Sequence, residues 1–350
     1  MQHKYFAASN SSEGFRSYFP QIFDAVDRLY VIKGGPGTGK SGFMKRCASA
    51  AEQRGDEVEY YYCSSDPASL DGILIKREKE TVGIIDGTLP HSWEPMHPGA
   101  RDEIVNLGQF WNASLLRGQK NEIMALSNKK SAAYKRAYDY LRSCGNLRAV
   151  TDSLLRSVTD KSKLNAAVER LIKSLELPDG EMVAKPAVLR AVAMTGKHRL
   201  DSFEKNAECV FYIGSFYGVG QMIMSAIERV LQSKAVKVRL SYDPISPQLV
   251  DGIFIEDVKV AFVLTEREED EAENGGRLIN PKRFVRADKL RGIRGELRYA
   301  SRLYRDALEG ALHALSEAKV YHFLLEDIYK NAMDFAALTE FTRTFAASLD

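Results

Sequence analysis

Hydrophobic and polar positions alternate in two ways in the first hundred residues, and each way predicts a different element. The short β-rich runs RLYVI (28–32), EVEYYYC (57–63) and TVGIID (81–86) predict strands, and the last is apolar enough to be central. Between the first two, SGFMKRCASAAEQRG (41–55) predicts a helix that Gly55 ends. Strands that alternate with helices predict an α/β three-layer fold with a mainly parallel sheet.

The same pattern recurs later in the chain and predicts an internal duplication. YVIKGGPGTGKSGFM, which starts at Tyr30, aligns without a gap with FYIGSFYGVGQMIMS, which starts at Phe211, at a constant offset of 181 residues. SSDPASLDGILI and TVGIID then match SYDPISPQLVDGIFI and KVAFVL in the same order. The halves meet near LELPDGEMVAKPA, where prolines and a glycine interrupt the helical pattern. We therefore expect domains at residues 1–178 and 179–350.

Both halves end in a helical pattern. From Ala300 to Leu315, apolar residues recur every three or four positions, which predicts one apolar face over more than four turns. The stretch from Tyr134 to Leu141 has the same spacing. The simplest architecture places a long helical hairpin after each half, with the apolar stripe as core or as a contact between the halves.

Composition limits the classes of function. The formal charge of +2, from 49 basic and 47 acidic residues, gives no general attraction to nucleic acid or to an anionic membrane. The four cysteines form no CxxC pair, which favours reduced thiols over disulfides or a zinc site. The N-terminus lacks a signal-peptide core, and no apolar run reaches the roughly 18–20 residues that span a bilayer. We expect a cytoplasmic protein without a membrane partner.

The segment GGPGTGKS carries most of the candidate chemistry. It fits the pattern G-x-x-x-x-G-K-[ST] (Walker A), and it follows a predicted strand and opens a predicted helix. Glycines let successive N–H groups approach phosphate oxygens, and the helix N-terminus favours the same anion. Lys40 would reach the β- and γ-phosphates, and the hydroxyl of Ser41 would bind Mg²⁺. The predicted nucleotide-binding residues are Gly34, Gly35, Pro36, Gly37, Thr38, Gly39, Lys40, Ser41 and Gly42.

Two aspartates that follow predicted strands complete the predicted site. Asp86 ends the apolar run VGIID and would hold Mg²⁺ together with Ser41, although an aspartate before glycine is also a common turn residue. Asp66 lies where RecA-like ATPases often place the carboxylate that orients water. The predicted catalytic residues are therefore Lys40, Asp86 and Asp66. However, Asp66 reappears as Asp243 in the second half, which also fits a turn role.

The second half lacks every group that this chemistry requires. Lys40, Ser41 and Asp86 align with Gln221, Met222 and Leu264, respectively. Glutamine carries no charge, and a methionine sulfur is a poor ligand for a hard cation. The duplication therefore predicts one nucleotide site, with the second half as a scaffold, a pseudo-dimer partner or a regulatory face.

Other polar segments leave alternatives open. Arg46, Arg101 or the basic run 280–298 could stabilise a transferred phosphoryl group, and the run could instead contact nucleic acid or form a solvated helix face. The segment PHSWEPMHPG (90–99) is better explained as a structured loop near the mouth of the site than as a metal site. The acidic segment 266–276 predicts a solvated loop.

The segments KGGPGTGKS, CSSDPASLDG, IIDGT and HPGARDEIVNLGQFW resemble a group of bacterial two-half P-loop ATPase-like proteins. The resemblance runs through nearly the whole chain and implies ATP binding and hydrolysis, carried by residues 34–41 and Asp86. Other members keep a second recognisable loop, where this chain has GSFYGVGQM. A mechanism that needs two ATP sites in each chain is therefore not expected here.

Three functions fit these observations. The first is Mg²⁺-dependent ATP hydrolysis that drives or signals a rearrangement between the halves. The second is a kinase that transfers the γ-phosphoryl group to a small molecule or nucleoside. The third is a non-hydrolysing module that binds a protein partner under nucleotide control. No NKxD-type guanine-reading segment is visible, which favours ATP over GTP. Nucleic acid as a partner rests on the basic run alone.

Overall fold

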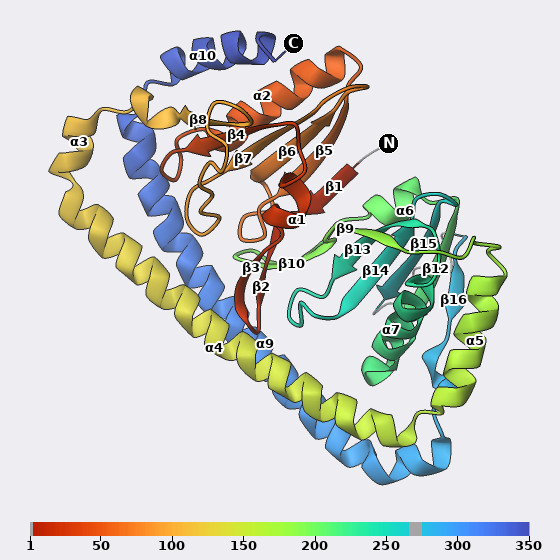
Figure 1. Cartoon of the computed structure of the whole chain (residues 1–350). Helices are drawn as coiled ribbons and strands as arrows, with labels where there is room; N and C mark the ends of the chain where they lie inside the picture. The colour runs from red at the N-terminus through yellow and green to blue at the C-terminus, as the bar shows by residue number, and fades with distance from the viewer. Residues whose placement is uncertain (1–2, 266–274, 350) are drawn as a thin grey trace.

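The computed structural model describes residues 3–265 and 275–349 and shows two α/β halves joined by a pair of long helices (Figure 1). The acidic segment expected to be a solvated loop lies largely outside the described residues. The first half contains, in chain order, β1 (His3–Phe6), β2 (Ala8–Ser11), β3 (Gly14–Ser17), α1 (Phe19–Phe23), β4 (Arg28–Lys33), α2 (Lys40–Gln53), β5 (Glu57–Tyr62), β6 (Leu70–Lys76), β7 (Thr81–Asp86), β8 (Asp102–Asn106), η1 (Leu107–Phe110), α3 (Ala113–Gly118), α4 (Lys120–Val158) and α5 (Lys161–Lys173).

The second half repeats most of this order. Its elements are β9 (Val183–Pro186), β10 (Arg190–Ala193), β11 (Gly196–Arg199), α6 (Ser202–Asn206), β12 (Cys209–Gly214), η2 (Phe216–Gly218), α7 (Val219–Leu231), β13 (Lys237–Tyr242), β14 (Val250–Ile255), β15 (Val260–Thr265), β16 (Arg277–Ile279), η3 (Pro281–Phe284), α9 (Ala287–Ala332) and α10 (Phe335–Ala347).

Each half has one six-stranded sheet, and the two sheets share one topology. The strand order is β1-β5-β6-β7-β4-β8 in the first and β9-β13-β14-β15-β12-β16 in the second. Both sheets have a register shift at the same place, between Tyr61 and Tyr62 in one half and between Ser241 and Tyr242 in the other. Equal order and equal irregularity are what a duplicated architecture requires.

The sheets are mixed, so the expectation of a mainly parallel sheet is confirmed only in part. Three of the five strand pairs in the first sheet are parallel, but β6 runs antiparallel to both β5 and β7. Parallel neighbours need a long crossover, and only short connections separate β5, β6 and β7. The sequence pattern located strands without showing their direction.

The longer helices that pack on each sheet cover its outer face. In the first half α2 and α10 cover this face, and in the second half α7 and α5 do so. The inner faces enclose a shared apolar core, to which α1 contributes Phe19 and Phe23 and α6 contributes Phe203. The inner face of each sheet is therefore covered by the opposite half together with the short helices α1 and α6.

The long helices do not form a hairpin within each half, which corrects that expectation. Instead α4 and α9 pair along their length, and each carries the chain to the opposite half (Figure 1). There α5 packs against α7, and α10 packs against α2. All described strands of the first sheet precede residue 178 and those of the second follow it, but the outer helices α5 and α10 are exchanged.

The two exchanges are built alike. Asp160 and Asp334 cap α5 and α10, and their N–H groups donate to the carbonyl oxygens of Phe284 and Phe110, each at 2.8 Å. A constant offset of 174 residues relates these segments, from 106 to 280 and from 160 to 334. The repeat therefore includes the helices, where sequence comparison did not detect it.

The apolar stripe expected on the last long helix is confirmed as core. Leu308, Ala311 and Leu315 pack with Ala137 and Leu141 where α9 crosses α4. Burying each leucine side chain contributes about 1.5–3 kcal/mol, so this seam holds the long helices together. Among the described helices, none combines the length and apolar character needed to cross a membrane.

Candidate functional site

The loop between β4 and α2 presents unbonded N–H groups at a helix N-terminus. Gly37 and Gly39 have φ values of +69° and +86°, in the left-handed region that favours glycine. Within the described part of the chain, the N–H groups of residues 35 and 37–40 donate no backbone hydrogen bond. Such groups, together with the positive end of the α2 dipole, form a ready anion-binding site.

The other side of this loop is covered by the end of α9. A Cβ atom at Gly37 would lie 2.7 Å from the carbonyl oxygen of Glu326, and one at Gly35 would lie 2.6 Å from the ring of Tyr329. The glycines are therefore required for packing against α9 as well as by the turn. Because α9 begins in the second half, this contact connects the loop to the opposite end of the molecule (Figure 1).

Lys40, the first residue of α2, points back over the loop. Its Nζ atom donates hydrogen bonds to the carbonyl oxygens of Gly34 (3.1 Å) and Gly35 (2.7 Å) and lies 3.5 Å from Oδ2 of Asp86. The side chains of Lys40 and Asp86 are only 12% and 13% exposed. The structure thus brings together the cation and the carboxylate that the sequence placed 46 positions apart.

Asp86 ends β7 beside β4. Its Oδ1 atom accepts hydrogen bonds from the N–H (2.9 Å) and the hydroxyl (2.5 Å) of Thr88. Burial raises the pKa of the Asp86 carboxyl above its usual value, although the nearby charge of Lys40 opposes this rise. Asp86 is therefore a turn residue through Oδ1, while Oδ2 faces Lys40.

Ser41 and Asp86 offer the hard oxygen donors that Mg²⁺ prefers. The Ser41 hydroxyl oxygen accepts a hydrogen bond from the N–H of Leu70 at 3.0 Å, which fixes its position and leaves its remaining lone pair for a metal. The chemistry of this donor set fits Mg²⁺. In the second half Met222 and Leu264 stand at these places and do not fit it.

A buried ion pair lies next to Asp86 and was not expected from the sequence. His91 Nε2 lies 2.8 Å from Asp71 Oδ2, and both residues are almost fully buried. Burial disfavours the charged imidazole, but the Asp71 carboxylate outweighs it and raises the pKa of His91. The charge of Asp71 in turn raises the pKa of Asp86. His91 is therefore inside the protein, next to the site, rather than in a loop at its mouth.

Lys130 of α4 is a further residue that the sequence did not single out. Burial and the charge of Lys40 both lower the pKa of Lys130, which places its ammonium group in the field of the loop. Lys130 lies in a polar stretch of a long helix, SNKKSAAYK, with no motif around it. Only the path of α4 past the first half brings it near the site.

The remaining candidates have other contacts. Asp66 Oδ2 accepts a hydrogen bond from the Ser69 hydroxyl at 2.6 Å within its own turn, so its catalytic role stays a prediction. Arg46 donates to the Thr339 hydroxyl on α10, and Arg101 forms an ion pair with Asp102. Neither arginine is directed at Asp86 or Lys40 by these contacts.

The corresponding loop of the second half is closed. The N–H groups of Gly218 and Gly220 both donate to the Ser215 carbonyl oxygen, at 2.9 and 3.2 Å, and α7 begins already at Val219. The side-chain amide of Gln221 donates to the carbonyl oxygen of Val250 at 2.7 Å. The N–H groups of Gly218 and Gly220, which would face phosphate in an open loop, are therefore used within the chain.

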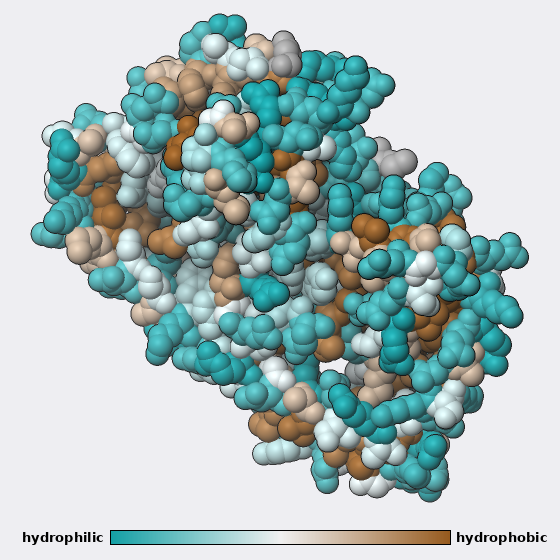
Figure 2. Space-filling model, viewed as in Figure 1, coloured by the Kyte–Doolittle hydropathy of each residue, from teal (hydrophilic) through white to brown (hydrophobic). Residues whose placement is uncertain are grey.

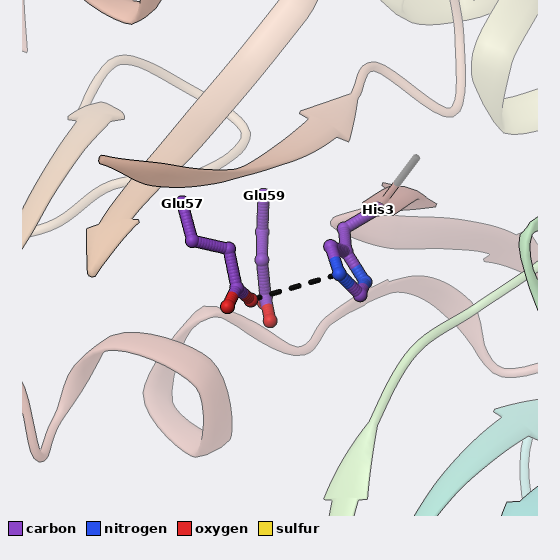
Figure 3. Close-up of side chains that lie close together, drawn as sticks. All are labelled: His3, Glu57 and Glu59. Carbon is purple, nitrogen blue, oxygen red and sulfur yellow. Dashed lines mark ion pairs between the residues drawn. The ribbon is translucent and has the colours of Figure 1, made fainter. Parts of the chain in front are cut away.

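One acidic cluster outside this site has the composition of a metal site. His3, Glu57 and Glu59 lie close together on β1 and β5 (Figure 3). However, Lys76 Nζ already lies 2.7 Å from Glu57 and 2.6 Å from Glu59, and Arg239 of the second half forms two hydrogen bonds with Glu59. These two cations balance the carboxylates, so we assign the cluster to the contact between the halves.

The raised pKa of Asp86 gives a testable pH dependence. The Asp86 carboxylate holds a metal only when it is ionised. As the pH decreases, Mg²⁺-dependent phosphate release should therefore begin to fall at a higher pH than it would with an aspartate of ordinary pKa. Asp86→Asn should weaken the apparent affinity for Mg²⁺ about 10- to 100-fold and remove this decrease of activity at low pH, the acid limb of the pH profile. Leu264→Asn is the matched control in the second half and should leave the profile unchanged. An unaltered acid limb in Asp86→Asn would contradict the assignment.

Comparison with protein-family models, curated proteins and solved structures found no significant match. Any function assigned to the chain therefore rests on the geometry of the loop and on its contrast with the second half.

Proposed function

We propose that the first half binds ATP with Mg²⁺ in a P-loop NTPase-type site formed by residues 34–41 and Asp86, and that it hydrolyses the ATP there. The observation that carries the proposal is the set of unbonded N–H groups at the start of α2, beside the Lys40–Asp86 pair. In the second half, the N–H groups of Gly218 and Gly220 are bonded within the chain, and the uncharged Gln221 and Leu264 replace Lys40 and Asp86. One Mg²⁺-dependent ATP site in each chain follows from this difference.

Each group of the site would have its own task. The loop N–H groups would bind the β-phosphate, and Lys40 would exchange its carbonyl contacts for phosphate oxygens, where its charge stabilises the transferred group. Ser41 and Asp86 would hold Mg²⁺, which would supply positive charge to neutralise the phosphates. Lys130 would add a second cation at the wall formed by α4.

A second candidate function is a nucleotide-gated interaction module. It is favoured by the contact of Glu326 and Tyr329 with the loop glycines, because a change in loop conformation would move the end of α9. A kinase remains the third interpretation, with an acceptor in place of water. The three interpretations share the nucleotide site and differ in the step after ATP binds.

Phosphate release measured with and without Mg²⁺ tests the proposal. We expect one Mg²⁺-dependent ATP site per chain and multiple turnovers of free phosphate that require Mg²⁺ and do not require an acceptor. ADP formation that depends on an added hydroxyl compound would identify a kinase. Tight binding with less than one turnover would identify the module, and absence of ATP binding would refute the site itself.

A further inference from the structure

The second half contains a large cavity below its closed loop. A space of about 1050 Å³ lies at the carboxyl ends of β12, β13 and β15, where Ser215, Asp243 and Thr265 line it. Its other walls include α4 and the first part of α9. The surface is hollowed between these helices and the second half (Figure 2). The volume reaches the upper end of the range typical of small-molecule sites.

The lining of this cavity is strongly cationic. Six basic residues line it, namely Arg148, Arg190, Lys197, Arg298, Arg302 and Arg305, against the two acidic residues Asp152 and Asp243. Arg148 pairs with Asp243, and Arg190 pairs with Asp251. Within the described residues, the three α9 arginines that line the cavity form no ion pair. A concave surface with a net positive charge concentrates anions.

The three α9 arginines follow a helical spacing. Arg298, Arg302 and Arg305 stand at positions i, i+4 and i+7, so they share one face over about 10 Å of helix axis. Guanidinium groups match phosphate geometry through paired N–H donors. Three such groups in a row fit an extended chain of phosphates better than a single anion.

The first half has no such row. The offset of 174 residues places Met124, Asn128 and Ser131 opposite Arg298, Arg302 and Arg305. The first half thus carries Lys40 on its loop and no arginine at these helix positions, whereas the second half carries three arginines on the helix. The loop of the second half retains no lysine, because Gln221 stands at the place of Lys40.

We propose that this cavity binds an oligophosphate, with two or more linked phosphate groups, without Mg²⁺. The arginines of α9 would replace both the loop N–H groups and the metal. The absence of metal follows from Met222 and Leu264 at the positions of Ser41 and Asp86. Tyr217, Tyr299 and Tyr304 also line the cavity and could stack on a base if the oligophosphate belongs to a nucleotide.

The test uses the full chain carrying Lys40→Ala, so that the first site does not contribute. Calorimetric titration in EDTA with inorganic tripolyphosphate should show one site per chain. The triple variant Arg298→Met, Arg302→Asn, Arg305→Ser, which installs the residues of the first half, should bind at least about tenfold more weakly. Arg291→Gln, at an α9 arginine that does not line the cavity, should change affinity less than about twofold.

Three results would overturn the proposal: no saturable binding of tripolyphosphate or ATP in EDTA, an absolute requirement for Mg²⁺, or equal weakening by Arg291→Gln and the triple variant. All four positions are exposed, so thermal unfolding of the variants should match that of the parent. ATP in EDTA is a second probe that distinguishes a free oligophosphate from a nucleotide. Equal affinities for ATP and tripolyphosphate would show that only the phosphate chain is recognised. Tighter binding of ATP, lost in Tyr299→Ala, would show that the ligand is a nucleotide.

Discussion

Lys40→Ala should abolish detectable ATP binding at the first half and lower Mg²⁺-dependent phosphate release by at least about 10²–10³-fold. This is the size of effect seen when one group that stabilises transition-state charge is removed from a dry site. Lys40 is the cation nearest to Asp86, and its side chain is mostly buried, so water would not replace its charge.

Gln221→Ala is the matched control, because Gln221 occupies the same place in the repeat. It removes the hydrogen bond to Val250 and no charge, so binding and phosphate release should stay within about twofold of the parent. Lys40→Ala protein that still turns over ATP with Mg²⁺ would refute the phosphate-loop assignment. Equal losses in both variants would indicate a general effect on folding.

Arg239→Met should lower the free energy of unfolding by about 3–5 kcal/mol, the largest stability effect expected in the chain. Arg239 reaches from β13 into the first half and donates to both carboxylate oxygens of Glu59, at 2.7 and 3.1 Å. Removing the arginine leaves a buried carboxylate with Lys76 as its remaining cation. Urea denaturation at pH 7 measures the difference.

The pH dependence of this pair has a defined sign. Burial opposes ionisation of Glu59, but Arg239 and Lys76 outweigh it and lower the pKa of Glu59 from 4.5 to about 2. A carboxyl with a lowered pKa stabilises the folded state above its unfolded pKa, so about 3 kcal/mol should be lost as the pH falls from 4.5 towards 2.

Two further variants test whether the loss of stability comes from the unpaired buried charge of Glu59. Glu59→Leu combined with Arg239→Met should recover part of the stability, since no unpaired charge stays buried. Glu208→Gln breaks the exposed pair with Lys259 and should cost no more than about 1 kcal/mol. A loss below about 1 kcal/mol for Arg239→Met would show that the pair does not hold the halves together.

Residues of both halves form the walls of both proposed sites. In the first half, Gly35 and Gly37 of the loop lie against α9, and α2 packs under Leu338 of α10. The cavity of the second half is lined by Arg148 of α4. Each proposed site includes a helix that crosses from the opposite half. A ligand at one site would therefore lie beside helices that also reach the other site.

Local patterns in the sequence were sufficient for the elements that carry their own signal. The loop at residues 34–41 is defined by consecutive residues, and so are the strand before it and the helix after it. The repeat was visible because the strands and the loop align in the same order in both halves. These features depend only on residues that are neighbours along the chain.

The tertiary structure alone decided everything that depends on long-range contacts. The antiparallel direction of β6, the exchange of α5 and α10, and the Asp71–His91 pair beside Asp86 bring together residues far apart in the chain. The cationic cavity likewise combines α4, α9 and the closed loop. A periodic pattern shows that a face is buried but not what covers it, because apolar burial is non-directional and many partners would satisfy it.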